Sequence, residues 1–240
     1  MSAPLEVGVA GFALWNSAQA ARPQPSILPP NERRRAPDTV AIALEVASAA
    51  CLNAGRDPAR LPTVFASTYG DLAITDYMCS TLARAPTTLS PTRFHNSVHN
   101  AAAGYWSIAT GGRQPYCALG AGRYTFAAGL FAAALRVCAD QTDVLLVAYD
   151  IQARGALTRI AHSHGMVGVA LVLSAAPAAG GAALQLAVTE TVPQPDVPSG
   201  CANAMAASLP LIAALQAKAT EVLSLALGPA SSLQVQVRGG

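Results

Sequence analysis

The segment that most constrains the fold of this chain is GRQPYCALGAGRYTFAAGLFAAAL, residues 112–135. It predicts a short strand over residues 116–119, a turn at glycines 120 and 122, and a helix over residues 124–139. In α/β enzymes such a turn often presents a nucleophile, because the first N–H groups of the helix point at it. Here the turn holds Arg123. A guanidinium keeps its proton near neutral pH, so this side chain cannot serve as a nucleophile.

Apolar runs and helical patterns alternate along the rest of the chain. Strands are predicted at residues 5–12, 61–68, 143–149, 165–175 and 182–192, and helices at residues 38–54, 71–83 and 96–110. A turn of Pro, Ala and Gly separates the last two strands, so we expect these two to form an antiparallel pair. Strands that alternate with helices and are followed by hairpin-like strands predict the α/β class with a mixed sheet.

The length and apolar content of the chain suit one domain, which we expect to span residues 1–240. A Pro-rich loop is expected at residues 193–201. It precedes a C-terminal region, residues 202–240, which we interpret as a helix over residues 202–217 and a tail. The tail contains SSLQVQV, residues 231–237, in which apolar and polar residues alternate as in an edge strand.

The charge and the cysteine pattern exclude several classes of function. Charged residues make up 12% of the chain and the formal net charge is +2, so we expect no nucleic-acid or membrane partner. Five cysteines without a CxxC pair predict no disulfide framework and no thiolate zinc site, and no cofactor is indicated. The N-terminus lacks the basic region of a signal peptide, and the apolar segment 204–227 contains Pro210, Lys218 and Glu221. A cytoplasmic protein is the expectation.

Hydrophobic residues, many of them alanine, make up 52% of the chain. This content suggests surface that is buried between subunits. Frequent alanine in a GC-rich genome explains it equally well.

The segments SPTRFHNSVHNAAAGYWSIATGGRQP, residues 90–115, and TFAAGLFAAALRVCADQTDVLLVAYD, residues 125–150, resemble the N-terminal half of the β-ketoacyl synthases. The resemblance implies a thiolase-like fold, here a single half with a mixed five-stranded sheet flanked by helices. With Asn100, Gly104 and Pro115 as anchors, Arg123 falls on the position of the family's catalytic cysteine. Cys117 lies six residues before it, inside the predicted strand.

The departures from this family imply a role without catalysis. An acyl chain must be held as a thioester, and an arginine cannot hold it. The family's two catalytic histidines come from its second half, and no histidine of this chain maps onto them. The pattern resembles the chain-length factors, including those of aryl polyene pigment pathways, which pair with an active ketosynthase. The resemblance implies a ketosynthase partner whose acyl tunnel this chain helps to shape, and it implies an acyl carrier protein as a second partner.

Two histidines raise an alternative. His95 and His99 are four residues apart, which on a helix places both imidazoles on one face. They could form half of a metal site, with His162 and His164 as further ligands, or serve a hydrolase. Structural hydrogen bonds near a subunit contact are the simpler interpretation. A homodimeric module that binds acyl groups or carrier proteins is a third alternative.

The resemblance also implies an interface and a buried turn. Arg123 is either a charge partner for a group on the other subunit or a solvated residue of the turn. The family's turn is buried, and an unpaired guanidinium there is costly, so we favour the paired arginine. The run Arg33, Arg34 and Arg35 is a hypothetical docking site for an acidic carrier protein, although such a run is usually a solvated face. The candidate partner-interface residues are Phe94, His95, Asn96, His99, Asn100, Tyr116, Cys117, Leu119, Arg123 and Tyr124.

Overall fold

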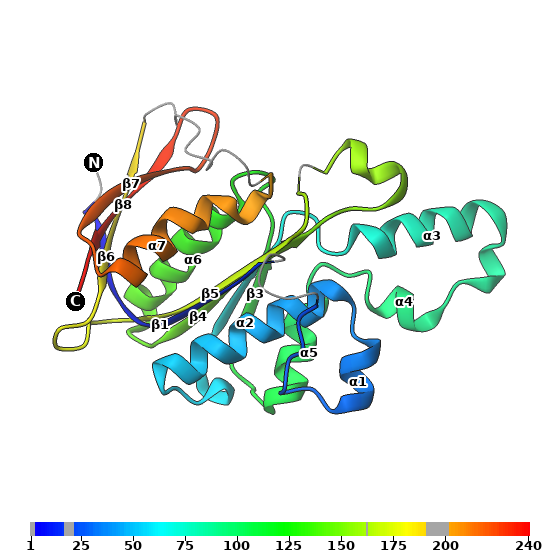
Figure 1. The fold of residues 1–240 in the computed structure, drawn as a ribbon, viewed down its shortest axis with the longest axis horizontal. Coiled ribbons are helices and arrows are strands. Elements are labelled where there is room, and N and C mark those ends of the chain that lie inside the picture. Colours follow the sequence, from blue (N-terminus) through cyan, green and yellow to red (C-terminus); the bar gives the residue numbers. More distant parts are fainter. Residues whose placement is uncertain (1–2, 17–21, 162, 191–201) are drawn as a thin grey trace.

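An eight-stranded mixed sheet runs through the molecule in the order β3-β2-β4-β5-β1-β6-β8-β7 (Figure 1). The computed structural model describes residues 3–16, 22–161, 163–190 and 202–240. The α/β class with a mixed sheet is confirmed, but the expectation of five strands is wrong because three more strands continue the same sheet. The strands are β1 (Leu5–Asn16), β2 (Thr63–Ala66), β3 (Tyr116–Leu119), β4 (Val144–Ile151), β5 (Met166–Ser174), β6 (Ala183–Thr189), β7 (Glu221–Ala226) and β8 (Ser232–Arg238).

Parallel pairing is confined to one end of the sheet. β2 pairs in parallel with β3 on one side, where Val64 lies opposite Cys117, and with β4 on the other, where Val64 lies opposite Leu146. β5 then runs antiparallel to both β4 and β1. Seven of the eight residues of β4 are buried, as is typical of a strand covered on both faces.

The predicted pairing of the last two apolar runs is wrong. β5 and β6 are not hydrogen-bonded neighbours, because β1 lies between them and pairs antiparallel with each. β1 can do so because it is 12 residues long: its Gly8–Asn16 part pairs with β5 and its Leu5–Gly8 part with β6. Periodicity in the sequence does not show which strand fills the space between two others.

The C-terminal region differs from the predicted helix and tail. Residues 204–208 form a 3₁₀ turn before helix α7 (Leu209–Ala217), and two strands follow. β8 is not an edge strand, because it lies between β6 and β7. The edge is β7, which was not predicted. The Pro-rich loop expected at residues 193–201 lies outside the described residues.

Helices cover both faces of the sheet. On one face α2 and α5 pack against Phe65, Leu145 and Val147, and on the other α6 and α7 pack against Val64, Leu146 and the strands β6 and β8. Helices of the single chain therefore lie against both faces of the sheet. The helices are α1 (Pro30–Arg35), α2 (Asp38–Ala54), α3 (Leu72–Arg84), α4 (Pro91–His95), α5 (Ala101–Thr110), α6 (Thr125–Asp140) and α7.

Helices α3 and α4 form an arm that projects from the sheet, at the right of Figure 1. A 3₁₀ turn (η2, Pro86–Thr88) joins them, and a second one (η3, Gly155–Arg159) packs against α3. The Asp71 carboxylate caps α3 by accepting a hydrogen bond from the Ile74 N–H. No residue of α3 is fully buried. Within the described part of the chain, no helix is both long and apolar enough to cross a bilayer.

Candidate functional site

The parallel strands β2, β3 and β4 bring their carboxyl ends to the same edge of the sheet. Ser67 and Thr68 follow β2, the turn 120–124 follows β3, and Asp150 is the penultimate residue of β4. Ligand sites of open α/β sheets lie at this edge. The turn predicted from the sequence therefore sits where a site is expected.

Close backbone contacts shape the turn. A Cβ atom at Gly120 would lie 2.8 Å from the Ser67 carbonyl oxygen and 3.0 Å from that of Thr68, so only glycine fits without a shift. Gly122 has φ +57°, which is the left-handed region. The Thr125 hydroxyl donates to the Gly122 carbonyl oxygen at 2.6 Å and accepts from the Ala121 N–H at 2.9 Å. The first residue of α6 thus holds the turn in place.

Arg123 lies at the surface of this turn. The residue is exposed, and its guanidinium carbon is 5.3 Å from the centre of the Tyr124 ring. It forms no ion pair with any described residue. Arg123 is therefore not buried in the single chain, and a charged partner on another subunit stays a prediction.

Asp150 is the buried carboxylate of the site, at 4% exposure. One oxygen accepts hydrogen bonds from the Ser67 hydroxyl and the Thr68 N–H, both at 2.9 Å, and the other accepts from the Ser163 hydroxyl at 3.1 Å. Burial raises the pKa of Asp150, although the hydrogen bonds from Thr68, Ser67 and Ser163 oppose the rise. Since both oxygens accept hydrogen bonds from other segments, this carboxylate holds the ends of β2 and β4 and the segment at Ser163 together.

The sequence analysis missed Asp150, Ser163 and Asn203. Ser163 also accepts a hydrogen bond from the Ala204 N–H at 3.1 Å, and the Asn203 side chain caps the following 3₁₀ turn. One signal was present for Asp150: a charged residue near the end of an apolar strand is rarely buried without partners. No local pattern connects it to Ser163 or Asn203.

The two histidines do not share a helical face. His95 is the last residue of α4, whereas His99 lies in the turn before α5. The His99 Nε2 atom is 2.8 Å from the Ser67 carbonyl oxygen, and the His95 ring lies 6.4 Å from the Tyr105 ring. His99 therefore faces a carbonyl and not a hydroxyl, so Ser67, His99 and Asp150 do not have the geometry of a hydrolytic triad.

Metal ligands and reactive thiols do not gather at this edge. No three His, Cys, Asp or Glu side chains cluster as a metal site within the ranges described above, and His162 lies outside them. Cys117 is exposed on β3 and Cys79 is exposed on α3. Burial, with a smaller effect of Asp57, raises the pKa of Cys51 to about 12. The turn 120–124 contains no cysteine.

The candidate interface residues divide by exposure. Leu119, Tyr124, His99 and Asn100 are half-buried, and the Asn100 amide donates to the Tyr116 hydroxyl at 3.0 Å. Asn96 is only 5% exposed, so it is not a surface contact of the single chain. The exposed members are Phe94, His95, Tyr116, Cys117 and Arg123.

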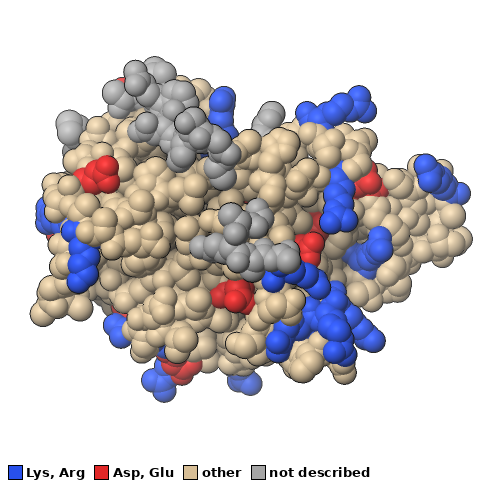
Figure 2. Space-filling view, viewed as in Figure 1, with Lys and Arg blue, Asp and Glu red and all other residues tan. Residues whose placement is uncertain are grey.

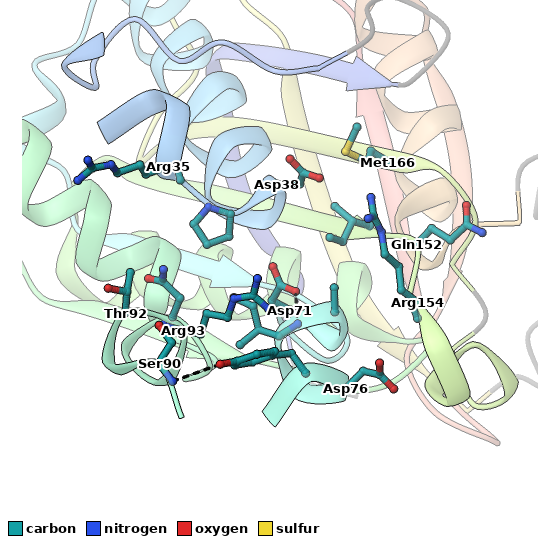
Figure 3. Close-up of a pocket in the computed structure, with 18 of the residues that line it drawn as sticks. Arg35, Asp38, Asp71, Asp76, Ser90, Thr92, Arg93, Gln152, Arg154 and Met166 are labelled. Atoms are coloured by element: carbon teal, nitrogen blue, oxygen red, sulfur yellow. Dashed lines mark hydrogen bonds between the residues drawn. The ribbon is translucent and has the colours of Figure 1, made fainter. Parts of the chain in front are cut away.

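Basic side chains gather at the end of the molecule that carries α1 and the arm (Figure 2). The three arginines of α1 do not present one face. Arg33 turns back and donates to the Leu28 carbonyl oxygen at 3.0 Å, and Arg34 donates to the Asn31 side chain. Arg35 lies at the rim of a cavity of about 920 Å³ between α2, α3, α4 and the ends of β4 and β5 (Figure 3).

Solved structures share this fold at low sequence identity. The ketosynthase ApeO in complex with its chain length factor ApeC from Xenorhabdus doucetiae matches with a TM-score of 0.68, 21% identity and coverage of 87% of this chain and 81% of that chain. A β-ketoacyl synthase from Burkholderia phymatum matches with a TM-score of 0.56 and 11% identity over 82% of this chain and 67% of that one. The structure of AntDE with AntF is that of a type II polyketide acyl carrier protein in complex with its ketosynthase. It matches with a TM-score of 0.58 and 10% identity, and the match covers 72% of this chain and 64% of that chain.

A comparison with curated proteins finds no match. The family described as "Beta-ketoacyl synthase, N-terminal domain" matches residues 12–227, which is most of the chain. The solved structures agree with this family in fold. This chain belongs to the β-ketoacyl synthase N-terminal domain family.

Proposed function

We propose that this chain is a non-catalytic subunit, similar to a chain-length factor, that pairs with an active β-ketoacyl synthase in a type II polyketide or aryl polyene pathway. One observation carries the proposal: the position that the resemblance assigns to the family's catalytic cysteine holds an exposed arginine on a tight turn before α6. The backbone that would present a reactive group is built with Gly120, Gly122 and Thr125 in place. A tight turn before a helix is present, but it carries an arginine, which cannot act as a nucleophile. This combination favours a structural role.

The open edge of β3 supports pairing with another chain. The carbonyl oxygens of Pro115 and Leu119 accept hydrogen bonds from the N–H groups of Thr63 and Ser67 on the β2 side. Because N–H and C=O groups alternate in direction along a strand, those of Tyr116 and Ala118 point to the open side. β3 ends the sheet, so these groups are free to bond a strand of a partner.

Exposed apolar side chains occur on β3 and on the elements that precede it in the chain. Tyr116 on β3 is 44% exposed and Ile108 on α5, which packs against β3, is 79% exposed. Val98 before α5 and Phe94 on α4 are 49% and 57% exposed. Large apolar side chains that gather beside an unpaired strand are typical of an interface. The pairing surface we propose therefore consists of the β3 edge with Phe94, Val98, Ile108 and Tyr116.

The proposed role in elongation follows from pairing. The subunit would supply part of the wall of the partner's acyl tunnel, where bulk limits chain length. The ApeO structure contains a ketosynthase with its chain length factor, and the AntDE structure contains a carrier protein with its ketosynthase. For the carrier protein, Arg34 and Arg35 are the basic side chains of α1 that remain exposed, and we propose that they attract its acidic surface.

Co-expression with a ketosynthase encoded beside it tests the proposal. We expect the two chains to co-elute as a heterodimer in gel filtration with light scattering, and we expect condensation only from the pair. A stable homodimer that ignores the ketosynthase would instead support the homodimeric binding module. A monomer that ignores it, or an acyl group found covalently on this chain during turnover, would overturn the proposal.

A further inference from the structure

The cavity of about 920 Å³ is built from separate elements of the chain (Figure 3). The segment 35–38 before and at the start of α2, the first turns of α3, α4, and the ends of β4 and β5 contribute its lining. Figure 3 shows Arg93 and Arg154 on opposite sides of the cavity with Asp71 between them, while Arg35 points away at the rim. The turn 120–124 is not part of the lining.

Arg93 is held in one orientation without an anionic partner. Its guanidinium carbon lies 3.9 Å from the centre of the Tyr77 ring. The Tyr77 hydroxyl in turn accepts a hydrogen bond from the Ser90 N–H at 3.2 Å, which fixes the ring. A guanidinium stacked by its face keeps its N–H groups at the edge, where they can bind an oxyanion with two hydrogen bonds. Within the described part of the chain, neither Arg93 nor Arg154 forms an ion pair.

The carboxylates of the lining are largely engaged elsewhere. Asp38 pairs with Arg22, which is outside the lining, at 3.0 Å. Asp71 accepts from the Ile74 N–H and from the Thr39 hydroxyl, both at 2.9 Å. These hydrogen bonds come from neutral donors, so Asp71 keeps its charge. Asp76, the third carboxylate of the lining, has neither an ion pair nor a hydrogen bond among the described residues. Among the described residues of the lining, three arginines (Arg35, Arg93 and Arg154) form no ion pair, against two carboxylates that form none, Asp71 and Asp76.

Asn96 supplies a second, independent observation. It is 5% exposed, it lines the cavity, and its Oδ1 atom is buried without a hydrogen-bond partner among the residues that the structure describes. A buried carbonyl oxygen without a donor carries a cost in free energy that a ligand or water N–H or O–H can remove. Asn96 follows Arg93 by three residues at the end of α4, a spacing that puts two side chains side by side.

We propose that this cavity binds a small oxyanion, a carboxylate or a phosphate, that also carries a hydroxyl or amide N–H. Arg93 binds the anionic group with Arg154 facing it, and the Asn96 Oδ1 atom accepts the ligand's hydrogen. The site is separate from the β3 edge and does not depend on the pairing with a ketosynthase. Its chemistry is that of a recognition site for a charged small molecule, because none of these side chains is a nucleophile.

Calorimetric titrations of the full chain at low ionic strength test the site. The probes are 4-hydroxybutyrate, 2-hydroxyethyl phosphate, butyrate, which lacks the hydroxyl, and 4-hydroxybutyramide, which lacks the charge. We expect saturable binding of 4-hydroxybutyrate or 2-hydroxyethyl phosphate, and the one that binds more tightly shows whether the site prefers a carboxylate or a phosphate. Because hydrogen bonds to charged groups are strong, we expect Arg93→Gln to raise the dissociation constant of the bound anion by about tenfold or more. The amide should not bind.

The matched control is Arg84→Gln, which removes the same charge from the last turn of α3 outside the lining and should leave the affinity within about twofold. Asn96→Ala should abolish the preference for 4-hydroxybutyrate over butyrate. Arg154→Gln, an exposed position, serves as a second variant where Arg93→Gln fails to fold. The proposal is overturned by the absence of saturable binding of both anions, or by equal losses in Arg93→Gln and Arg84→Gln.

Discussion

The Ser67 hydroxyl donates a hydrogen bond of 2.9 Å to the carboxylate of Asp150, which lies 83 residues further along the chain. This bond joins the end of β2 to the end of β4, and the Ser67 carbonyl oxygen bonds His99 on its other side. The same serine thus links three segments that surround the turn holding Arg123. A buried polar network therefore holds this edge of the sheet together.

Replacing Asp150 with Asn tests the network through its pH dependence. Burial raises the folded-state pKa of Asp150 above its ordinary value of 3.8, so the folded chain takes up a proton before the unfolded chain does. The contribution of Asp150 to stability therefore increases as the pH falls from neutral toward 3.8. We expect the unfolding free energy of the wild type minus that of Asp150→Asn, measured by urea titration, to become more positive as the pH is lowered. A difference that becomes less positive would contradict this sign.

Gly120→Ala should destabilise the isolated chain. The added methyl group meets two backbone carbonyl oxygens, at 2.8 Å and 3.0 Å, which cannot rotate away. We expect a loss of about 1–3 kcal/mol, the usual cost of overpacking. Gly104→Ala in α5 is the matched control, because a methyl group there meets nothing within 4 Å and alanine favours a helix. Equal thermal midpoints for the two variants would show that the close approach is unimportant.

Ala118→Pro should weaken pairing with the ketosynthase. Proline removes an N–H that points to the open side of β3 and leaves the hydrogen bonds to β2 in place. One lost hydrogen bond corresponds to roughly tenfold in the dissociation constant. Surface plasmon resonance measures the affinity, and circular dichroism verifies that the fold is kept. An unchanged affinity would show that the partner does not add a strand at β3.

Thiol labelling offers a footprint of the same interface. In the free chain Cys79 and Cys117 are exposed and should react with iodoacetamide, whereas Cys51, whose pKa burial raises to about 12, should not. In the complex we expect Cys117 to be protected and Cys79 to react as before. Peptide mass spectrometry separates the sites. Protection of Cys79 alone would place the partner on the arm instead of on β3.

Arg123→Cys should not restore condensing activity. On the proposed alignment the thiol would stand at the family's nucleophile position, but His99 is bonded to a carbonyl oxygen, and the resemblance maps no histidine of this chain onto the family's catalytic pair. Without a base or a decarboxylation site, a thiol alone does not complete the reaction. The assay is release of carbon dioxide from malonyl carrier protein, with the active partner omitted. Release above the level of the wild-type chain would contradict the proposed structural role.

The sequence by itself determined the local elements of this protein. The apolar runs at residues 116–119 and 143–149 are strands, the glycines at 120 and 122 form the turn, and α6 follows within a residue of its predicted start. Arg123 was placed on that turn by position alone. These features follow from periodicity and turn chemistry, which depend on residues close together in the chain.

The tertiary structure alone decided which elements meet. β1 lies between β5 and β6, β8 lies inside the sheet, and Asp150 meets Ser67 and Ser163. The reason is physical: backbone hydrogen-bonding groups are the same in every strand, so the choice of neighbour depends on side-chain packing across the whole sheet. The exposure of Arg123 and the buried oxygen of Asn96 are likewise set by contacts between distant segments.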